Sequence, residues 1–326
     1  MESSNNNQNR GGQGLVQGGK EKKKEKKYYG KFLILIIFIV LSIEYYAYVF
    51  GVMLKYMTQK NFKLILTLLV IFHILVLLLL MAFISTMMTN PGEIPLYWGF
   101  YIGDDDYKRK RYCLICNAFK PERSHHCSVC NICVLNMDHH CPWVDNCIGF
   151  YNRKFFMQLL FFVVILTIYV DISELYFIID MCLRLFKKHI KYSEILRLGL
   201  VIICYAAVFV FSFIITMFLK FHIKLVLYNS TTIESLDTEH KKDNEKFDIG
   251  FRQNWEQIFG VDPLFWLFPF PTKRGRPEGD GLTWKTNEGN NESALKMNEI
   301  NNKNFESINN YDTNFNSNKQ FSQGTK

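Results

Sequence analysis

Cysteine and histidine residues in the middle of this 326-residue chain repeat with a period of fourteen positions. One set consists of Cys113, Cys116, His126 and Cys133. Fourteen positions further on, a second set consists of Cys127, Cys130, His140 and Cys147. Each set offers three thiols and one imidazole, a ligand set of closed, four-coordinate structural zinc sites. The spacing therefore predicts two structural Zn²⁺ ions, and the histidines and paired spacing argue against an iron–sulfur cluster.

The sequence Asp138-His139-His140-Cys141 combines a carboxylate, two imidazoles and a thiol. His140 belongs to the second metal set, so His139 and Cys141 have no place in either set. Cys141 is in phase with the first cysteine of each set, but the third set is never completed. Its other three positions are filled by Val144, Lys154 and Phe161. A thiol beside a spare imidazole and a carboxylate has the components of an activated nucleophile, whereas a role in zinc binding alone conflicts with the ligand count.

Four long apolar stretches flank the cysteine- and histidine-rich segment 113–147, two before it and two after it. They cover residues 32–54, 64–88, 155–179 and 195–219. A helix needs about 20 apolar residues to cross roughly 30 Å of hydrocarbon, so each stretch is long enough to span. The sequence therefore predicts an all-α polytopic membrane protein with four transmembrane helices. A cysteine-rich double-zinc domain lies between spans two and three.

The predicted organisation follows from these stretches and from shifts in composition. A disordered cytosolic N-terminus (1–27) precedes transmembrane helices 1 and 2 (28–90), and the zinc domain follows (91–154). Transmembrane helices 3 and 4 (155–219) lead to an ordered cytosolic C-terminal region (220–284) and a disordered Asn-rich tail (285–326). Both terminal segments are polar and lack the apolar residues that a packed core requires.

Four spans place both termini and the metal-binding segment on one side of the membrane. Seven of the nine cysteines lie in that segment, which is typical of reduced, cytosol-facing thiols rather than of a disulfide scaffold. The count of Lys and Arg also favours the cytosol for this side, although a basic cluster at 184–191 blurs the signal. Much of the net charge of +8 comes from lysines at 20–27, which predicts contact with anionic lipid and no nucleic-acid partner.

The metal-binding block with its Asp138-His139-His140-Cys141 sequence resembles the cysteine-rich domain of the Asp-His-His-Cys protein S-acyltransferases, also called palmitoyltransferases. The likeness extends to Pro142-Trp143, to Asn146-Cys147-Ile148-Gly149 and to Asn152 with Phe155. After span four, Thr231-Thr232-Ile233-Glu234 resembles the family's Thr-Thr-x-Glu motif, and residues 254–260 resemble its Asn-containing motif. One departure is Asn90-Pro91-Gly92, where the family usually has Asp-Pro-Gly; asparagine supports the same turn, but any role that needs a charge is lost.

The resemblance implies two-step transfer of palmitate from palmitoyl-CoA to cysteine thiols of membrane-associated proteins. Cys141 would attack the thioester and form an acyl-enzyme, with His139 as the base and Asp138 fixing the His139 tautomer. By family habit, the protein would reside in the Golgi or ER membrane, with the plasma membrane as the alternative and an active site facing the cytosol. The sequence does not determine whether an accessory subunit is required. The rival functions are a catalytically silent zinc scaffold and, less fitting for spans without polar faces, a transporter with a regulatory zinc lobe.

Further residues are candidates for binding the substrate and supporting the site. The candidates for binding the phosphates of CoA are Lys120, Arg123 and His125. For the basic run at 108–111, contact with lipid headgroups is the stronger expectation. Trp143 is expected near the thioester at the membrane interface, or in simple packing. The resemblance implies that Thr232 and Asn254 support the catalytic loop and the C-terminal segment.

Ionisable residues inside the apolar stretches have two interpretations. An acid within a span is a functional candidate, but Asp171, Glu174 and Asp180 fit a simpler expectation. Span three would end near Val170, and these acids would pair with basic residues such as Arg184 in the headgroup region. The isolated histidines are expected in core or headgroup contacts; they are His73, His189 and His222. The apolar segment 262–270 is too short to span and is expected to lie in the interface or to fill a groove.

Overall fold

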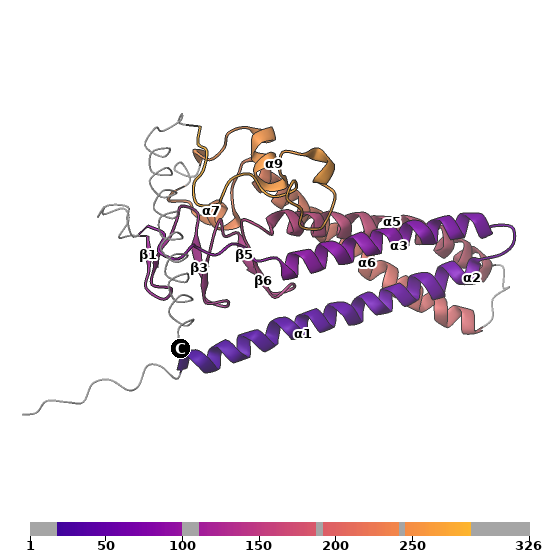
Figure 1. The fold of residues 1–326 in the computed structure, drawn as a ribbon. Coiled ribbons are helices and arrows are strands. Elements are labelled where there is room, and N and C mark those ends of the chain that lie inside the picture. The colour runs from indigo at the N-terminus through magenta and orange to yellow at the C-terminus, as the bar shows by residue number, and fades with distance from the viewer. Residues whose placement is uncertain (1–17, 100–110, 187–191, 241–244, 288–326) are drawn as a thin grey trace, which may run out of the picture.

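Four long helical segments form the membrane part of the protein in the computed structural model (Figure 1). The structure describes residues 18–99, 111–186, 192–240 and 245–287, with side chains from residue 29 onward. Among these residues, the segments long and apolar enough to cross a membrane are Tyr29–Tyr56, Phe62–Met88, Arg153–Phe186 and Tyr192–Leu227. The predicted four-span membrane fold is therefore confirmed, with the cysteine-rich domain between spans two and three.

The first span is built from three consecutive elements: α1 (Gly18–Tyr46), the π-helical η1 (Ala47–Met53) and α2 (Leu54–Tyr56). The other spans are α3 (Phe62–Met88), α5 (Arg153–Phe186) and α6 (Tyr192–Leu227). α5 packs along both α3 and α6, and the first span contacts them mainly through η1. Helices suit these stretches because hydrocarbon offers no hydrogen bonds, so each backbone amide must find a partner within its own segment.

Two clusters of apolar side chains hold the helices together. One lies toward the η1 end and includes Tyr48, Phe72 and Phe177. The other lies at the zinc-domain end, where Cys141 and Phe156 pack with the last turns of α6. The chemical block is thus packed directly against the ends of the spans.

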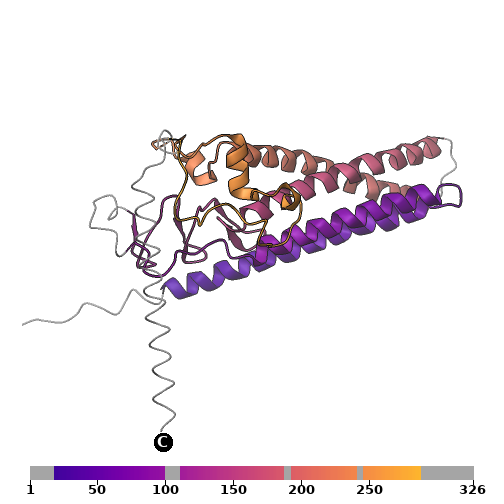
Figure 2. The ribbon, with the colours of Figure 1, turned by 45° about the horizontal axis from the view of Figure 1, so that its top comes forward.

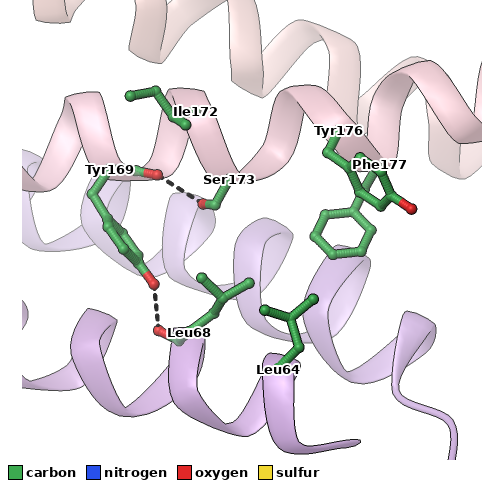
Figure 3. A pocket seen from close by; sticks show the side chains of 7 residues that line it. All are labelled: Leu64, Leu68, Tyr169, Ile172, Ser173, Tyr176 and Phe177. Atoms are coloured by element: carbon green, nitrogen blue, oxygen red, sulfur yellow. Dashed lines mark hydrogen bonds between the residues drawn. The ribbon is translucent and has the colours of Figure 1, made fainter. Parts of the chain in front are cut away.

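An apolar pocket of about 290 Å³ opens between α3 and α5 (Figure 3). Leu64 and Leu68 line it from α3, and Tyr169, Ser173 and Phe177 line it from α5. Tyr169 Oη donates a hydrogen bond across the helix pair to the Leu68 carbonyl oxygen at 2.7 Å. Because Leu64 lies near the start of α3, the pocket is at the opposite end of the spans from the cysteine-rich domain, so it is not the site of the predicted chemistry.

Three short antiparallel hairpins form the cysteine-rich domain. They pair β1 (Tyr112–Cys113) with β2 (Ala118–Phe119), β3 (His125–Cys127) with β4 (Ile132–Val134), and β5 (His139–Cys141) with β6 (Asn146–Ile148). Their turns contain Asn117, Asn131 and Asp145, each at positive φ, where Asn and Asp are tolerated better than most residues. These turn residues are also fourteen positions apart, so the repeat in the sequence is a repeat of hairpins.

The C-terminal region folds over the zinc-domain end of the spans (Figures 1 and 2). It contains α7 (Thr232–Leu236), α9 (Phe251–Phe259) and the short 3-10 helix η2 (Pro263–Phe265). α7 begins with a capping box in which Thr231 and Glu234 satisfy each other's backbone amides. We call residues 261–277, which follow α9, the strap.

The structure differs from the sequence-based expectations in three places. Residues 18–27, expected to be disordered, belong to α1. α5 continues to Phe186 instead of ending near Val170, and Asp171 and Glu174 are buried within the protein. Asp180 does pair with Arg184, at 2.8 Å. Short strands, which an all-α description omits, arise because the tight ligand spacing of the metal sets suits hairpins.

Candidate active site and metal centres

The first ligand set converges on one point. His126 Nδ1 lies 3.7 Å from Cys113 Sγ, 3.2 Å from Cys116 Sγ and 3.8 Å from Cys133 Sγ. Metal–ligand bonds of about 2.0–2.3 Å in a tetrahedron give ligand–ligand edges of about 3.4–3.8 Å. The four donor atoms therefore have the separations of a tetrahedral metal site.

The second set has the same geometry one hairpin later. His140 Nδ1 lies 3.4 Å from Cys130 Sγ and 3.7 Å from Cys147 Sγ, and these two sulfurs are 3.5 Å apart. Cys127 completes the group, and its Sγ also accepts a hydrogen bond from the Cys130 amide at 3.3 Å. All nine cysteines of the chain are free of disulfides, so the thiols are available as ligands.

Hairpin pairing explains why ligands distant in sequence meet. His126 is paired with Cys133 across β3 and β4, and His140 with Cys147 across β5 and β6. Residues directly opposite each other on an antiparallel pair have Cβ atoms about 4.5–5.5 Å apart, close enough to share a metal. Each histidine and its paired cysteine thus complete a set whose other two cysteines come from the strand and turn of the preceding hairpin.

Cys141 ends β5 and lies outside both ligand sets. Its side chain is 6% exposed and packs in the apolar cluster that includes Val144, Phe156, Met157 and Leu160. Val144 lies in the β5–β6 turn, and the other three lie on the first turns of α5. The thiol therefore faces the end of the membrane spans rather than a metal.

Asp138 is a buried carboxylate held by several donors. It is 1% exposed, and its Oδ2 accepts hydrogen bonds from His139 Nδ1 and Thr232 Oγ1, both at 2.7 Å. Its Oδ1 accepts from the Thr232 amide at 3.0 Å and lies 3.4 Å from Arg153 Nη2. Burial alone would raise the pKa of Asp138, but Arg153 and His139 outweigh it and hold that pKa well below its usual range. The carboxylate is therefore ionised and fixed in place.

His139 is positioned between Asp138 and Cys141. Its ring packs edge-on against Phe156, with centroids 5.1 Å apart, and lies 5.9 Å from the His222 ring. Burial lowers the pKa of His139, but hydrogen bonding to Asp138 and to the Cys141 side chain outweighs burial and raises it to about 9. Since Nδ1 is bonded to Asp138, Nε2 is the nitrogen left to exchange a proton with a thiol.

Arg153 and His222 belong to the site, although sequence reasoning missed both. Arg153 is 1% exposed, donates to the Ser230 carbonyl oxygen, and keeps Nε and Nη1 without a hydrogen-bond partner among the described residues. A lone Arg at the start of an apolar stretch is equally typical of a headgroup anchor. His222, expected in an isolated contact, lies on α6 with its ring tilted against that of His139. His73 is exposed on α3 and not in the core; its Nε2 lies 3.0 Å from Tyr45 Oη. His189 lies outside the described residues.

Arg123 does not fit the expectation that it binds CoA phosphate. Its guanidinium makes a bidentate ion pair with Glu234, at 2.7 and 2.8 Å, and donates to the Asn229 side chain and carbonyl. It also lies 4.4 Å from the ring centroids of both Phe247 and Trp284. The residue is 4% exposed, so its donors are occupied inside the protein. Arg123 connects the metal domain to the C-terminal region instead.

The remaining candidates occupy different surroundings. Lys120 and His125 are half-buried on the first metal lobe, and burial together with Arg111 lowers the pKa of His125. Trp143 is 52% exposed. Asn254 is fully buried, and its Nδ2 donates to the Leu227 carbonyl oxygen at 2.7 Å, which joins α9 to the end of α6.

Asn90, the departure from the family motif, forms the turn after α3. Its side-chain oxygen accepts a hydrogen bond from the Gly92 amide at 2.8 Å, and its Nδ2 donates to Glu93 at 2.9 Å. The amide group thus performs the turn-forming role that an aspartate would perform.

Comparison with known proteins agrees with this geometry. A sequence profile described as DHHC palmitoyltransferase matches residues 106–239. "Probable protein S-acyltransferase 12" of Arabidopsis thaliana is 32% identical over 262 residues, which cover 74% of this chain and 87% of that protein. "Palmitoyltransferase ZDHHC20" of Bos taurus is 38% identical over 183 residues, covering 55% of this chain and 47% of that protein. This chain is therefore a member of the DHHC palmitoyltransferase family.

Proposed function

We propose that this protein transfers long-chain acyl groups from acyl-CoA to cysteine thiols of other proteins, with Cys141 as the nucleophile. The observation that carries the assignment is the arrangement of Asp138, His139 and Cys141. A fixed carboxylate orients an imidazole, the imidazole lies beside a thiol, and that thiol belongs to neither metal set. This is the order of roles in other nucleophile–base–orienter sites.

The chemistry divides into two thioester exchanges. Cys141 Sγ gives its proton to His139 and attacks the acyl carbonyl, so a new thioester forms while the bond to CoA sulfur breaks. The departing CoA thiolate takes the proton back from His139. In the second step His139 accepts the proton of a substrate thiol, whose sulfur attacks the Cys141 thioester and releases the Cys141 thiol. The ionised Asp138 supports both steps because it stabilises the imidazolium that each step requires.

The location of Cys141 suits an acyl chain. Each buried methylene contributes about 0.8 kcal/mol, so a chain of roughly 16 carbons gains most where the thioester lies beside hydrocarbon. Cys141 packs against Phe156, Met157 and Leu160 at the start of α5, where the aqueous domain meets the spans. In this proposal the CoA headgroup stays in water while the apolar chain enters hydrocarbon.

The two ligand sets would hold structural Zn²⁺. Three thiols and one imidazole complete a tetrahedron and leave no position for a reacting water, so the metals would fold the domain and would not act on the substrate. His140 is adjacent to both His139 and Cys141, so a metal bound there would hold the backbone of the reacting residues in place. Lys120 as a cation and His125 as a neutral hydrogen-bond donor, both half-buried, would contact the CoA phosphates.

The acceptors would be membrane-associated proteins with cysteines on the side where the metal domain lies. We assign that side to the cytosol, because seven reduced thiols cluster there. Residence in the Golgi or ER membrane remains part of this proposal, with the plasma membrane as the alternative.

The experiment that tests the proposal is thioester labelling. The full-length protein in detergent is incubated with palmitoyl-CoA that carries a clickable chain, and hydroxylamine-sensitive label is measured on wild type and Cys141→Ser. Label on wild type that is lost in Cys141→Ser supports the acyl-enzyme. A folded, metal-loaded wild type that takes up no label would favour a scaffold without catalysis.

A further inference from the structure

The strap lies over the zinc-domain end of the membrane spans (Figure 2), where side chains of α3 and α5 donate hydrogen bonds to it. Ser85 Oγ, on α3, donates to the Pro269 carbonyl oxygen at 2.6 Å. Gln158 Nε2, on α5, donates to the carbonyl oxygens of Trp266 and Phe268 at 2.8 and 3.1 Å. Backbone groups of the strap are thus held by side chains of two different helices, which fixes its position.

These contacts also define the depth of the strap. Ser85 lies three residues before the end of α3, and Gln158 lies five residues after the start of α5. At 1.5 Å per residue, the strap carbonyls are bound about 5–8 Å inside the helix ends. Lys154 is one helical turn nearer the end of α5 than Gln158, and its Nζ donates to the Gly275 carbonyl oxygen at 3.0 Å. Residues 266–269 of the strap therefore lie further from the zinc-domain end of the spans than Gly275 does.

Apolar side chains occupy the deeper level and are exposed. They are Leu264 (67% exposed), Leu267 (62%), Phe268 (42%) and Phe270 (38%). Interfacial segments of membrane proteins bury apolar faces of this kind at the boundary between headgroups and acyl chains. Since the spans of this protein lie in a bilayer, lipid is the partner that covers these side chains.

Cations occupy the shallower level. Lys273, Arg274 and Arg276 are exposed, flank Gly275, and form no ion pair with the described residues. Gly275 itself is buried, and a Cβ there would lie 2.7 Å from Lys154 Nζ, so this loop is fitted closely to α5. Three positive charges thus lie on a loop held against α5, next in sequence to an exposed apolar segment, which is an arrangement that complements an anionic phospholipid.

We propose that the strap is a binding site for anionic phospholipid. Leu264, Leu267 and their apolar neighbours enter the boundary of the bilayer, and the three cations bind the charged headgroup. The site uses none of the residues assigned to acyl transfer, so the proposal stands independently of that function.

Photo-crosslinking in a bilayer of known composition tests the site. Benzoylphenylalanine is placed at Leu267 in the full-length protein, which is reconstituted into nanodiscs of phosphatidylcholine with a minority of phosphatidylserine. After irradiation, mass spectrometry of the strap peptide measures the adducts of each lipid. We expect lipid adducts in which phosphatidylserine is enriched several-fold over its share of the bilayer.

Two charge variants decide whether the cations cause the enrichment. Combined Lys273→Gln, Arg274→Gln and Arg276→Gln should keep the lipid adducts but return their ratio to the mixing ratio. A control with the same loss of charge at the other end of the spans combines Lys55→Gln, Lys60→Gln and Lys63→Gln, and it should keep the enrichment. The proposal is overturned if Leu267 gives no lipid adduct, if wild-type adducts follow the mixing ratio, or if both variants lose the enrichment equally.

Discussion

The second and third hairpins of the metal domain have the same fold, but the cysteine at one equivalent position has a different role in each. In β3–β4, His126 is paired with Cys133 around a turn at Asn131; in β5–β6, His140 is paired with Cys147 around a turn at Asp145. Cys127 and Cys141 occupy equivalent positions at the ends of β3 and β5. Cys127 meets three further ligands, whereas Cys141 meets apolar side chains and His139.

The two hairpins differ in which residues from later in the chain pack against them. The positions that would complete a third metal set carry Val144, Lys154 and Phe161, and the last two belong to α5. A membrane helix thus replaces a ligand-bearing loop, so the thiol is left free and close to hydrocarbon. The same local structure can bind a metal or present a nucleophile, depending on its neighbours.

Exchanging the two thiols for hydroxyls gives the largest expected effect. Cys127→Ser should remove one metal and unfold the domain, since structural zinc contributes on the order of 10–16 kcal/mol in small zinc domains. Cys141→Ser should keep both metals and lose only the acyl-enzyme. Metal content per chain and protease resistance distinguish the two outcomes. Equal metal loss in both variants would contradict the comparison.

Removing the imidazole that distinguishes the third hairpin should slow acylation without loss of metal. We expect His139→Gln to reduce the rate of thioester formation by about 10²–10⁴-fold, the usual contribution of a general base. Single-turnover labelling measures the rate, and metal content serves as the control. A rate within a factor of about three of wild type would exclude His139 as the base.

Arg123, just before the second hairpin, should contribute to the stability of the protein and not to acyl-CoA binding or acyl transfer. Arg123→Gln leaves Glu234 buried and uncompensated, which costs about 3–5 kcal/mol when a buried ion pair is broken. The combined variant with Glu234→Gln should recover part of that loss. Thermal unfolding in detergent measures both. If Arg123→Gln instead weakened acyl-CoA binding with unchanged stability, the original expectation of a phosphate contact would return.

The reactivity of Cys141 in the third hairpin should depend on Thr232, because Thr232 holds Asp138 in place. Thr232→Val removes one hydrogen bond to the carboxylate, which contributes about 1.5–3 kcal/mol when an acceptor is charged, and it should slow thioester formation by about tenfold. Thr232→Ser keeps the hydroxyl and is the matched control. Its labelling rate should stay near that of wild type.

The smallest expected effect is a pH dependence of the Arg123–Glu234 contact. Burial raises the pKa of Glu234, but Arg123 and the capping hydrogen bonds outweigh burial and lower it below its ordinary value of 4.5. A lowered pKa in the folded state contributes stability above pH 4.5 that is lost as pH falls through the folded value. The stability difference between wild type and Glu234→Gln should be constant near neutral pH and shrink below about pH 4.5. A difference that stays constant on acidification would contradict the ionised contact.

Features that depend on neighbouring residues, such as the spans and the ligand sets, could be predicted from the sequence. Contacts between distant segments could not. Four apolar stretches and the fourteen-residue repeat define the spans and both ligand sets, because length and spacing alone determine them. Arg123 meets Glu234 across 111 residues, and His222 reaches His139 only through the packing of α6 on α5. The sequence also did not predict the end of α5 at Phe186, because hydropathy marks where apolar residues end but not where a helix continues.

The Arg123–Glu234 contact has a consequence for the order in which the protein is made. Arg123 is synthesised before the third and fourth spans, and Glu234 is synthesised after both. Until residue 234 has emerged, a guanidinium destined for burial has no carboxylate to neutralise it. The metal-bearing domain therefore reaches its final packing only once the last two helices have been inserted, so membrane insertion and completion of the active site are coupled during biogenesis.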